Sequence, residues 1–254
     1  MSNYSDFSLV YDKLMNDVDY KKRTNYLLNL FNKNGKKPEL LLDLACGTGG
    51  FSNQMALNGV EVIGIDMSEE MLSAARENSA ELGTDVLFLC QKAEELDLYG
   101  TVDGAICCMD SINHITNIKN LKKAIEKVSL FLEKDSLFIF DVNTPYKHEK
   151  VLADNTFVIE EDNVYCVWQN EYHKESLTTD INLDFFIEED GVYERYSEDF
   201  SERAYTVKEL TEILEEYDFE VLHIYNDMSE ENLDPTSERA IFVAKKVRET
   251  NGYY

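Results

Sequence analysis

A glycine-rich turn between a short apolar strand and a helix constrains this chain more than any other feature. Residues 40–50 read L-L-L-D-L-A-C-G-T-G-G. Glycines lack a Cβ, so they let the backbone approach a ligand closely and adopt positive φ. The amides at the start of the following helix stay open toward that ligand. In a doubly wound sheet such a turn lies at the carboxyl ends of the strands, where ligands bind.

Three classes of ligand compete for this turn. A P-loop requires a lysine after the glycines, and none follows here. A dinucleotide site requires a third glycine where this chain has Ser52. Asp43, just before the turn, would repel a pyrophosphate but suits the ammonium and sulfonium charges of S-adenosylmethionine. The turn therefore favours S-adenosylmethionine, with Asp43 among the cofactor-binding residues.

Asp66 closes the next apolar segment, residues 60–65, about 20 residues beyond the glycines. An acid at this place accepts hydrogen bonds from both ribose hydroxyls of a nucleoside. Because NAD carries the same ribose, Asp66 predicts a nucleoside without choosing between the two cofactors.

Strands and helices alternate along most of the chain, which predicts an α/β fold with a doubly wound, mostly parallel sheet. Seven strands are expected at 39–44, 60–65, 85–90, 102–108, 136–140, 220–225 and 240–245. Helices are expected at 18–31, 51–58, 68–83, 117–132 and 206–217. Ser68 and the pair Thr206 and Glu209 are typical helix N-caps.

Residues 151–204 differ in texture, because polar and apolar residues alternate with period two and Asp190-Gly191 is typical of a hairpin turn. This pattern predicts an inserted antiparallel β meander, with 1–150 and 205–254 forming the cofactor-binding α/β domain. Residues 154–203 hold 15 acids and three bases. The meander is expected to act as a lid that selects a cationic or amine acceptor, although a solvated acidic face explains the same charges.

Composition excludes several classes of partner. The formal net charge of −26 disfavours bulk nucleic acid and anionic membranes. Apolar segments are too short to span a bilayer, and the first ten residues contain no basic cluster, so a cytoplasmic protein is expected. Its five cysteines lack C-x-x-C spacing, which predicts reduced thiols and no metal site.

With these motifs in view, the chain resembles the class I S-adenosylmethionine-dependent methyltransferases, whose fold is Rossmann-like. D-L-A-C-G-T-G-G is similar to the first motif of that superfamily, and V-I-G-I-D-M-S to the second. About 200 of the 254 residues fit, leaving the meander as the variable part. The family often has an acid at the position of Gln91, so the adenine contact departs from the pattern here. The resemblance implies cofactor contacts from Ala45, Cys46, Gly47 and Gly49 in the turn, from Asp66 and Met67, from Gln91, Ala93 and Glu94 around the adenine, and from Cys108 and Met109 beside the methionine portion.

The N-terminal segment carries part of this resemblance. Tyr11-Asp12-Lys13-Leu14-Met15 is similar to a bacterial small-molecule branch of the superfamily and to sugar N-methyltransferases of antibiotic pathways. The resemblance implies that Tyr11 closes over the methyl group; ordinary helix packing is the alternative. Arg23 is a candidate partner for the cofactor carboxylate or an exposed helix residue.

Methyl transfer from a sulfonium is an in-line displacement, so the enzyme chiefly aligns the reactants in a water-poor pocket. His114 is the candidate general base, because its ordinary pKa is near neutrality, or else a loop histidine bonded locally. Asp110 either orients an acceptor amine or starts a turn. The expected protein is thus a monomeric or homodimeric methyltransferase acting on a small molecule at N or O. A non-catalytic S-adenosylmethionine-binding module and a nicotinamide-dependent oxidoreductase are the alternatives.

Overall fold

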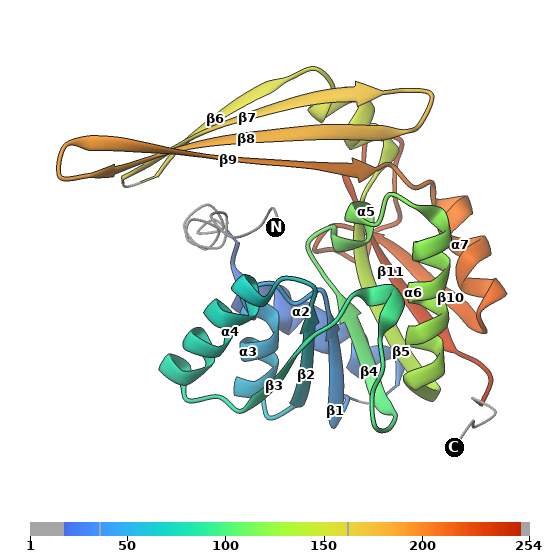
Figure 1. Cartoon of the computed structure of the whole chain (residues 1–254). Coiled ribbons are helices and arrows are strands. Elements are labelled where there is room, and N and C mark those ends of the chain that lie inside the picture. Colours follow the sequence, from blue (N-terminus) through green and yellow to red (C-terminus); the bar gives the residue numbers. More distant parts are fainter. Residues whose placement is uncertain (1–17, 36, 162, 250–254) are drawn as a thin grey trace.

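A seven-stranded sheet forms the centre of the protein, as the computed structural model shows for residues 18–35, 37–161 and 163–249 (Figure 1). Its strand order is β10-β11-β5-β4-β1-β2-β3. The strands are β1 (Leu40–Leu44), β2 (Glu61–Asp66), β3 (Val86–Cys90), β4 (Val102–Cys107), β5 (Leu132–Asn143), β10 (Phe219–Asn226) and β11 (Arg239–Lys246). Strands β1 to β5 pair in parallel, and β11 and β10 add antiparallel strands at one edge. The predicted doubly wound, mostly parallel sheet is confirmed, and its strand order reverses between β1 and β4.

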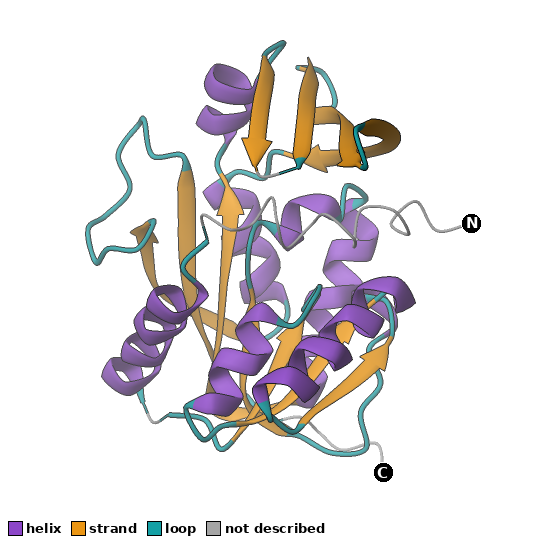
Figure 2. Cartoon of the chain, turned by 90° about the vertical axis from the view of Figure 1, so that its left-hand side faces the viewer, coloured by secondary structure: helices purple, strands orange, loops and turns teal. Residues whose placement is uncertain are grey.

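Helices cover both faces of this sheet (Figure 2). The helices are α2 (Tyr20–Asn34), α3 (Gly50–Leu57), α4 (Glu69–Leu82), α5 (Ser111–His114), α6 (Ile118–Phe131) and α7 (Val207–Glu216). Side chains alternate between the two cores along each strand. Leu41 and Ile106 pack with α2 and α3, whereas Leu42 and Ala105 pack with α6 and α7. Burial on both faces explains why these strands are nearly continuous apolar runs.

The predicted caps begin the helices they were assigned to. The Ser68 hydroxyl accepts the backbone N–H of Met71, and Thr206 and Glu209 form a reciprocal capping box. Helix α2 starts two residues later than predicted, because the side chain of Asp19 accepts the N–H of Lys22 and sets the first turn.

Strand β5 is much longer than the predicted segment 136–140. It begins as soon as α6 ends and continues to Asn143. Pairing with β4 starts at Leu132, and pairing with β11 reaches Asn143 opposite Arg239. The extra length comes from these neighbouring strands, which residue propensities do not report.

A second sheet of four antiparallel strands forms the predicted meander and crosses the carboxyl edge of the large sheet as a long arm (Figure 1). Its strands, in spatial as in chain order, are β6 (Thr156–Glu161), β7 (Val164–His173), β8 (Thr178–Glu189) and β9 (Val192–Arg203). Asp190 and Gly191 both have positive φ, as a tight two-residue hairpin turn requires. A small core of Cys166, Leu183 and Phe185 holds the strands together.

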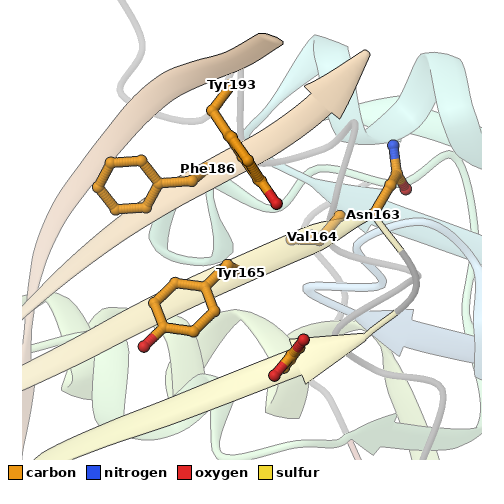
Figure 3. A pocket seen from close by; sticks show the side chains of 6 residues that line it. Asn163, Val164, Tyr165, Phe186 and Tyr193 are labelled. Atoms are coloured by element: carbon orange, nitrogen blue, oxygen red, sulfur yellow. The ribbon is translucent and has the colours of Figure 1, made fainter. Parts of the chain in front are cut away.

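The face of the meander opposite this core carries an aromatic hollow (Figure 3). Tyr165 and Phe186 meet edge to face with ring centroids 6.4 Å apart, and Tyr193 lies beside them. All of its lining residues belong to the meander, so it is separate from the glycine turn.

The five cysteines are free thiols, as predicted. Within the part of the chain that the structure describes, no helix combines the length and apolarity that a membrane span needs.

Candidate functional site

A cavity of about 200 Å³ opens at the carboxyl ends of the parallel strands, next to the point where the strand order reverses. This is the usual ligand position in doubly wound sheets. Predicted residues among its lining are Ala45, Gly47, Asp66, Met67, Gln91, Ala93, Glu94, Met109 and His114. The other lining residues are Leu44, Met71, Lys92, Cys107, Ser111 and Ile115, of which sequence reasoning missed Met71 and Ile115.

The glycine turn presents bare backbone to this cavity at one position. Gly47 has φ +54°, and a Cβ built there would have no heavy atom of the described residues within 4 Å apart from its chain neighbours. Gly49 has φ +78°, but its added Cβ would lie 3.0 Å from Phe88, inside the protein. Cys46 also turns inward, since its sulfur lies 3.0 Å from the position of a Cβ on Gly64. Gly47 is therefore the open part of the turn, while Cys46 and Gly49 shape it by packing.

The Asp66 carboxylate joins the turn to the end of β2. One oxygen accepts the N–H of Gly47 and the other accepts the N–H of Ser68, each at 2.9 Å. Burial raises the pKa of Asp66, and these backbone hydrogen bonds oppose the rise. Each oxygen keeps capacity for a further hydrogen bond, so the carboxylate can receive two neighbouring hydroxyl groups of a ligand.

Asp43 occupies a different environment from the one its sequence position suggested. Its carboxylate is buried and accepts the Ser52 hydroxyl at 2.5 Å, and Asp43 does not line the cavity described above. Burial raises its pKa to about 7, with the Ser52 hydrogen bond opposing and Asp66 adding to the rise. Its contact with cofactor charges stays a prediction.

Gln91 and Glu94 line the cavity while their polar groups brace the chain around the 3₁₀ turn η1 (Ala93–Glu95). The Gln91 amide both donates to the carbonyl of Asp97 at 3.1 Å and accepts the N–H of Asp97 at 2.9 Å. Glu94 accepts the Asn120 amide at 3.0 Å. An amide at position 91 thus makes a paired backbone contact that a carboxylate could make only in part.

At the end of β4 the cavity is lined by Cys107 and Met109, and Cys108 packs into the opposite core instead. Alternation along the strand sends these neighbours to opposite faces. Met109 and Asp110 both have positive φ, and their N–H groups donate to the two oxygens of Asp141 at 2.7 and 2.9 Å. Asp141 thereby fixes the turn that carries the next catalytic candidates.

Asp110 is held by protein groups. Arg239 donates to its carboxylate at 2.6 Å and also pairs with Asp141, and the Asn143 amide donates to Asp110 at 2.9 Å. Burial alone would raise the pKa of Asp110, but Arg239 and the nearby Lys147 lower it to about 2. Asp110 also occupies the N-cap position of α5, and its role toward an acceptor amine stays a prediction.

His114 ends α5 and joins the cavity to the meander. It lines the cavity, and its ring stacks on Phe200 of β9 with centroids 5.0 Å apart. Its Nε2 lies 3.6 Å from the Glu202 carboxylate, also on β9. Sequence reasoning missed Glu202, because alternation assigns it to the face of Phe200 without showing what that face touches.

Two further candidates come from the N-terminal part of the sequence. Arg23 donates to both oxygens of Asp227 at 3.0 Å, so its guanidinium is engaged there rather than at the cavity. Tyr11 lies outside the described residues.

Comparison with known proteins agrees with this geometry. Residues 41–135, which contain the glycine turn and Asp66, match the family model described as "Methyltransferase domain". The protein named "Putative methyltransferase YqeM" from Bacillus subtilis (strain 168) is 31% identical over 244 residues, covering 96% of this chain and 97% of the relative.

Solved structures share the whole fold, meander included. An S-adenosylmethionine-dependent methyltransferase from Clostridium acetobutylicum ATCC 824 is 30% identical with a TM-score of 0.88, covering 97% of this chain and all of that one. CalS10, an amino pentose methyltransferase from Micromonospora echinaspora solved with bound S-adenosylmethionine, is 16% identical with a TM-score of 0.75. The match covers 95% of this chain and 96% of CalS10.

Proposed function

Because the chain belongs to the class I S-adenosylmethionine-dependent methyltransferases, we propose that it methylates a nitrogen or oxygen of a small molecule bound between the cofactor cavity and the meander. The cofactor is S-adenosyl-L-methionine, which when bound supplies an activated methyl group on a sulfonium. The proposal concerns the acceptor and the residues that serve it.

The cavity suits this cofactor in chemistry. Open backbone at Gly47 lets a nucleoside approach the turn, and the Asp66 carboxylate offers acceptors for the two ribose hydroxyls. Met67 and Ala93 supply apolar surface on the adenine side, and Cys107 and Met109 line the end of β4 where the reacting group would lie. Among the described residues, no lysine follows the glycines of the turn, as one does in a P-loop.

His114 carries the proposal for the acceptor. It lines the cavity and stacks on Phe200 of the meander, so an acceptor held between the two would lie beside this ring. The acceptor atom forms its new bond to the methyl carbon while the carbon–sulfur bond breaks and the electron pair stays on sulfur. The proton that the acceptor loses passes to His114, whose neutral ring is the base.

Charge near His114 supports an acceptor that bears an amine. Glu202 and Asp110 lie close to the ring, Arg239 and Lys147 offset part of their charge, and the meander as a whole is acidic. A cationic group is attracted to such a site, whereas a carboxylate or phosphate is repelled.

A thermal-shift panel with S-adenosylmethionine, S-adenosylhomocysteine, NADH and ATP tests the cofactor part. Stabilisation follows the ratio of ligand concentration to Kd, so a micromolar binder at millimolar concentration adds roughly 4 kcal/mol. Only S-adenosylmethionine and S-adenosylhomocysteine should stabilise the protein. Stabilisation by NADH alone would indicate the oxidoreductase instead.

A panel of amines, amino sugars, phenols and alcohols, followed by mass spectrometry for a gained methyl group, tests the acceptor part. We expect methylation among the amines. Cofactor binding with no methylated product in the panel, or in a metabolite extract, would favour the non-catalytic binding module.

A further inference from the structure

We infer that Glu202, which strand β9 of the meander brings beside His114, is a positioning residue that fixes the ring of His114 and the hydrogen on its Nε2. This inference rests on the proposed function, because it assigns His114 a proton during methyl transfer. It also gives the meander a part in the chemistry beyond covering the pocket.

Two side chains of strand β9 lie against the His114 ring. The Glu202 Oε1 atom lies 3.6 Å from Nε2, and the Phe200 ring stacks on the imidazole with an interplanar angle of 26°. Glu202 and Phe200 are two residues apart, so both point from the same face of the strand. A residue pair of this kind restrains both the position and the rotation of a ring.

Glu202 is itself fixed by buried partners. Its side chain is 5% exposed, and Oε2 accepts the Asn143 amide at 3.3 Å. The same oxygen lies 3.7 Å from Nε2 of His148, whose Nδ1 is 2.8 Å from the Thr179 hydroxyl. Thr179 lies directly opposite Glu202 in the β8–β9 ladder. The carboxylate therefore cannot rotate away without losing its contacts with Asn143 and His148.

The two imidazoles beside Glu202 differ in exposure. His148 is fully buried, and burial lowers its pKa to about 4, so it stays neutral at pH 7. The His114 side chain is 33% exposed and reaches the cavity. Of the two rings, His114 is the one placed to become charged.

This arrangement assigns a direction to the proton. With Glu202 facing Nε2, the neutral His114 ring carries its hydrogen on Nε2, and Nδ1 is left to take the acceptor proton. Burial and Asp110 raise the pKa of Glu202, whereas a charged His114 lowers it, so the imidazolium and the carboxylate each favour the charged form of the other. In catalytic triads, likewise, a carboxylate orients a histidine and stabilises the imidazolium that forms.

Other charges act on the same ring and must stay constant in the test. Asp110 and Asp66 interact favourably with charged His114, and Asp110 is paired with Arg239 on β11. Lys147, from η2 (Lys147–Leu152, one turn of π-helix), interacts with both Glu202 and Asp110 and opposes a cation.

Histidine NMR of the full chain saturated with S-adenosylhomocysteine tests the inference without an acceptor. The chain has four histidines, and the His114 signal is identified by its loss in His114→Gln. We compare the wild type, Glu202→Gln and the control Glu194→Gln, an acid on the same face of β9 near the far hairpin. ¹⁵N shifts of the neutral ring report which nitrogen carries hydrogen.

We expect the Nε2–H tautomer in the wild type and a loss of that preference in Glu202→Gln, with little change in Glu194→Gln. A wild-type Nδ1–H tautomer overturns the inference even if Glu202→Gln does not fold. So does a tautomer preference that changes no more in Glu202→Gln than in the control.

A thermal-shift measurement on the same samples separates this result from the proposed function. Glu202→Gln should keep the wild-type stabilisation by S-adenosylhomocysteine, since Glu202 does not line the cofactor cavity described above. If the wild type is not stabilised, the cofactor assignment fails. If both are stabilised and the His114 signals are alike, only the role of Glu202 fails.

Discussion

The Asp66 carboxylate accepts the backbone N–H of Gly47 at 2.9 Å, across 19 residues of sequence. This one contact joins the two motifs on which the cofactor site depends. It places the carboxylate and the glycine turn side by side at the cavity, so the role of each in cofactor binding can be tested with its own variant.

Asp66→Ala should weaken S-adenosylmethionine binding strongly. Losing two hydrogen bonds to a charged group costs about 1.5–3 kcal/mol each, and even one of them corresponds to roughly tenfold or more in Kd. Isothermal titration calorimetry measures the change. Asp85→Ala, an exposed acid just before β3, is the matched control and should bind normally. An unchanged Kd in Asp66→Ala would mean that the ribose lies elsewhere.

Gly47→Ala should impair cofactor binding more than folding. A residue with a Cβ at φ +54° costs about 1 kcal/mol of backbone strain, and its methyl group would project into the cavity. Gly59→Ala is a close control, because Gly59 has φ +75° and open space for a Cβ but does not line the cavity described above.

Urea unfolding should give similar losses for the two variants, while cofactor titration should give a weaker Kd only for Gly47→Ala. Equal binding by both variants would contradict the placement of the cofactor against the turn.

Much of this cofactor half could be predicted from sequence, because local chemistry determines it. The turn at Gly47 needs positive φ, and Asp66 ends a strand whose neighbour ends at that turn, so spacing alone brings them together. The same holds for the caps at Ser68 and Thr206.

The acceptor half could not be predicted, because its contacts join segments that no local pattern connects. Glu202 reaches His114 across 88 residues (202 − 114), and Arg239 reaches Asp110 across 129. Strand alternation predicts which face of the meander carries Glu202, but it does not predict that His114 packs against that face. Arg23 and Cys108 were predicted to contact the cofactor from their residue types. In the structure Arg23 pairs with Asp227 and Cys108 packs into the core beside α2 and α3.

Asp43 makes the stability of the protein depend on pH. Burial raises its folded pKa to about 7, above the ordinary value near 4. Between these values the folded state holds a proton that the unfolded state releases, so the contribution of Asp43 to stability falls as pH rises from about 4 to about 7. Above pH 7 it is constant.

Asp43→Asn removes this titration and keeps an oxygen that can accept the Ser52 hydroxyl. Urea unfolding at about pH 5 and pH 7.5 measures the free energy of unfolding of both proteins. The difference, variant minus wild type, should be roughly 2–3 kcal/mol larger at pH 7.5 than at pH 5. A constant difference between the two proteins across this range would show that Asp43 is already ionised at pH 5.

Arg239→Met should destabilise the protein by about 3–5 kcal/mol at pH 7, because it leaves the carboxylates of Asp110 and Asp141 buried without their cation. Methionine keeps most of the apolar stem, so lost packing contributes little. The matched control is Arg76→Met, which removes an exposed pair with Glu69 and should cost less than about 1 kcal/mol.

The pH dependence distinguishes this cause from lost packing. Arg239 helps to lower the folded pKa of Asp110 to about 2, so its contribution is fully present above the unfolded value near 4 and is lost as pH falls toward 2. In Arg239→Met, burial is no longer opposed by Arg239 and raises the pKa of Asp110, which takes up a proton as pH falls. The gap between variant and wild type in urea unfolding should therefore narrow from pH 7 toward pH 4. A gap that stays constant over that range would assign the loss to packing and leave the ion pairs without a net role in stability.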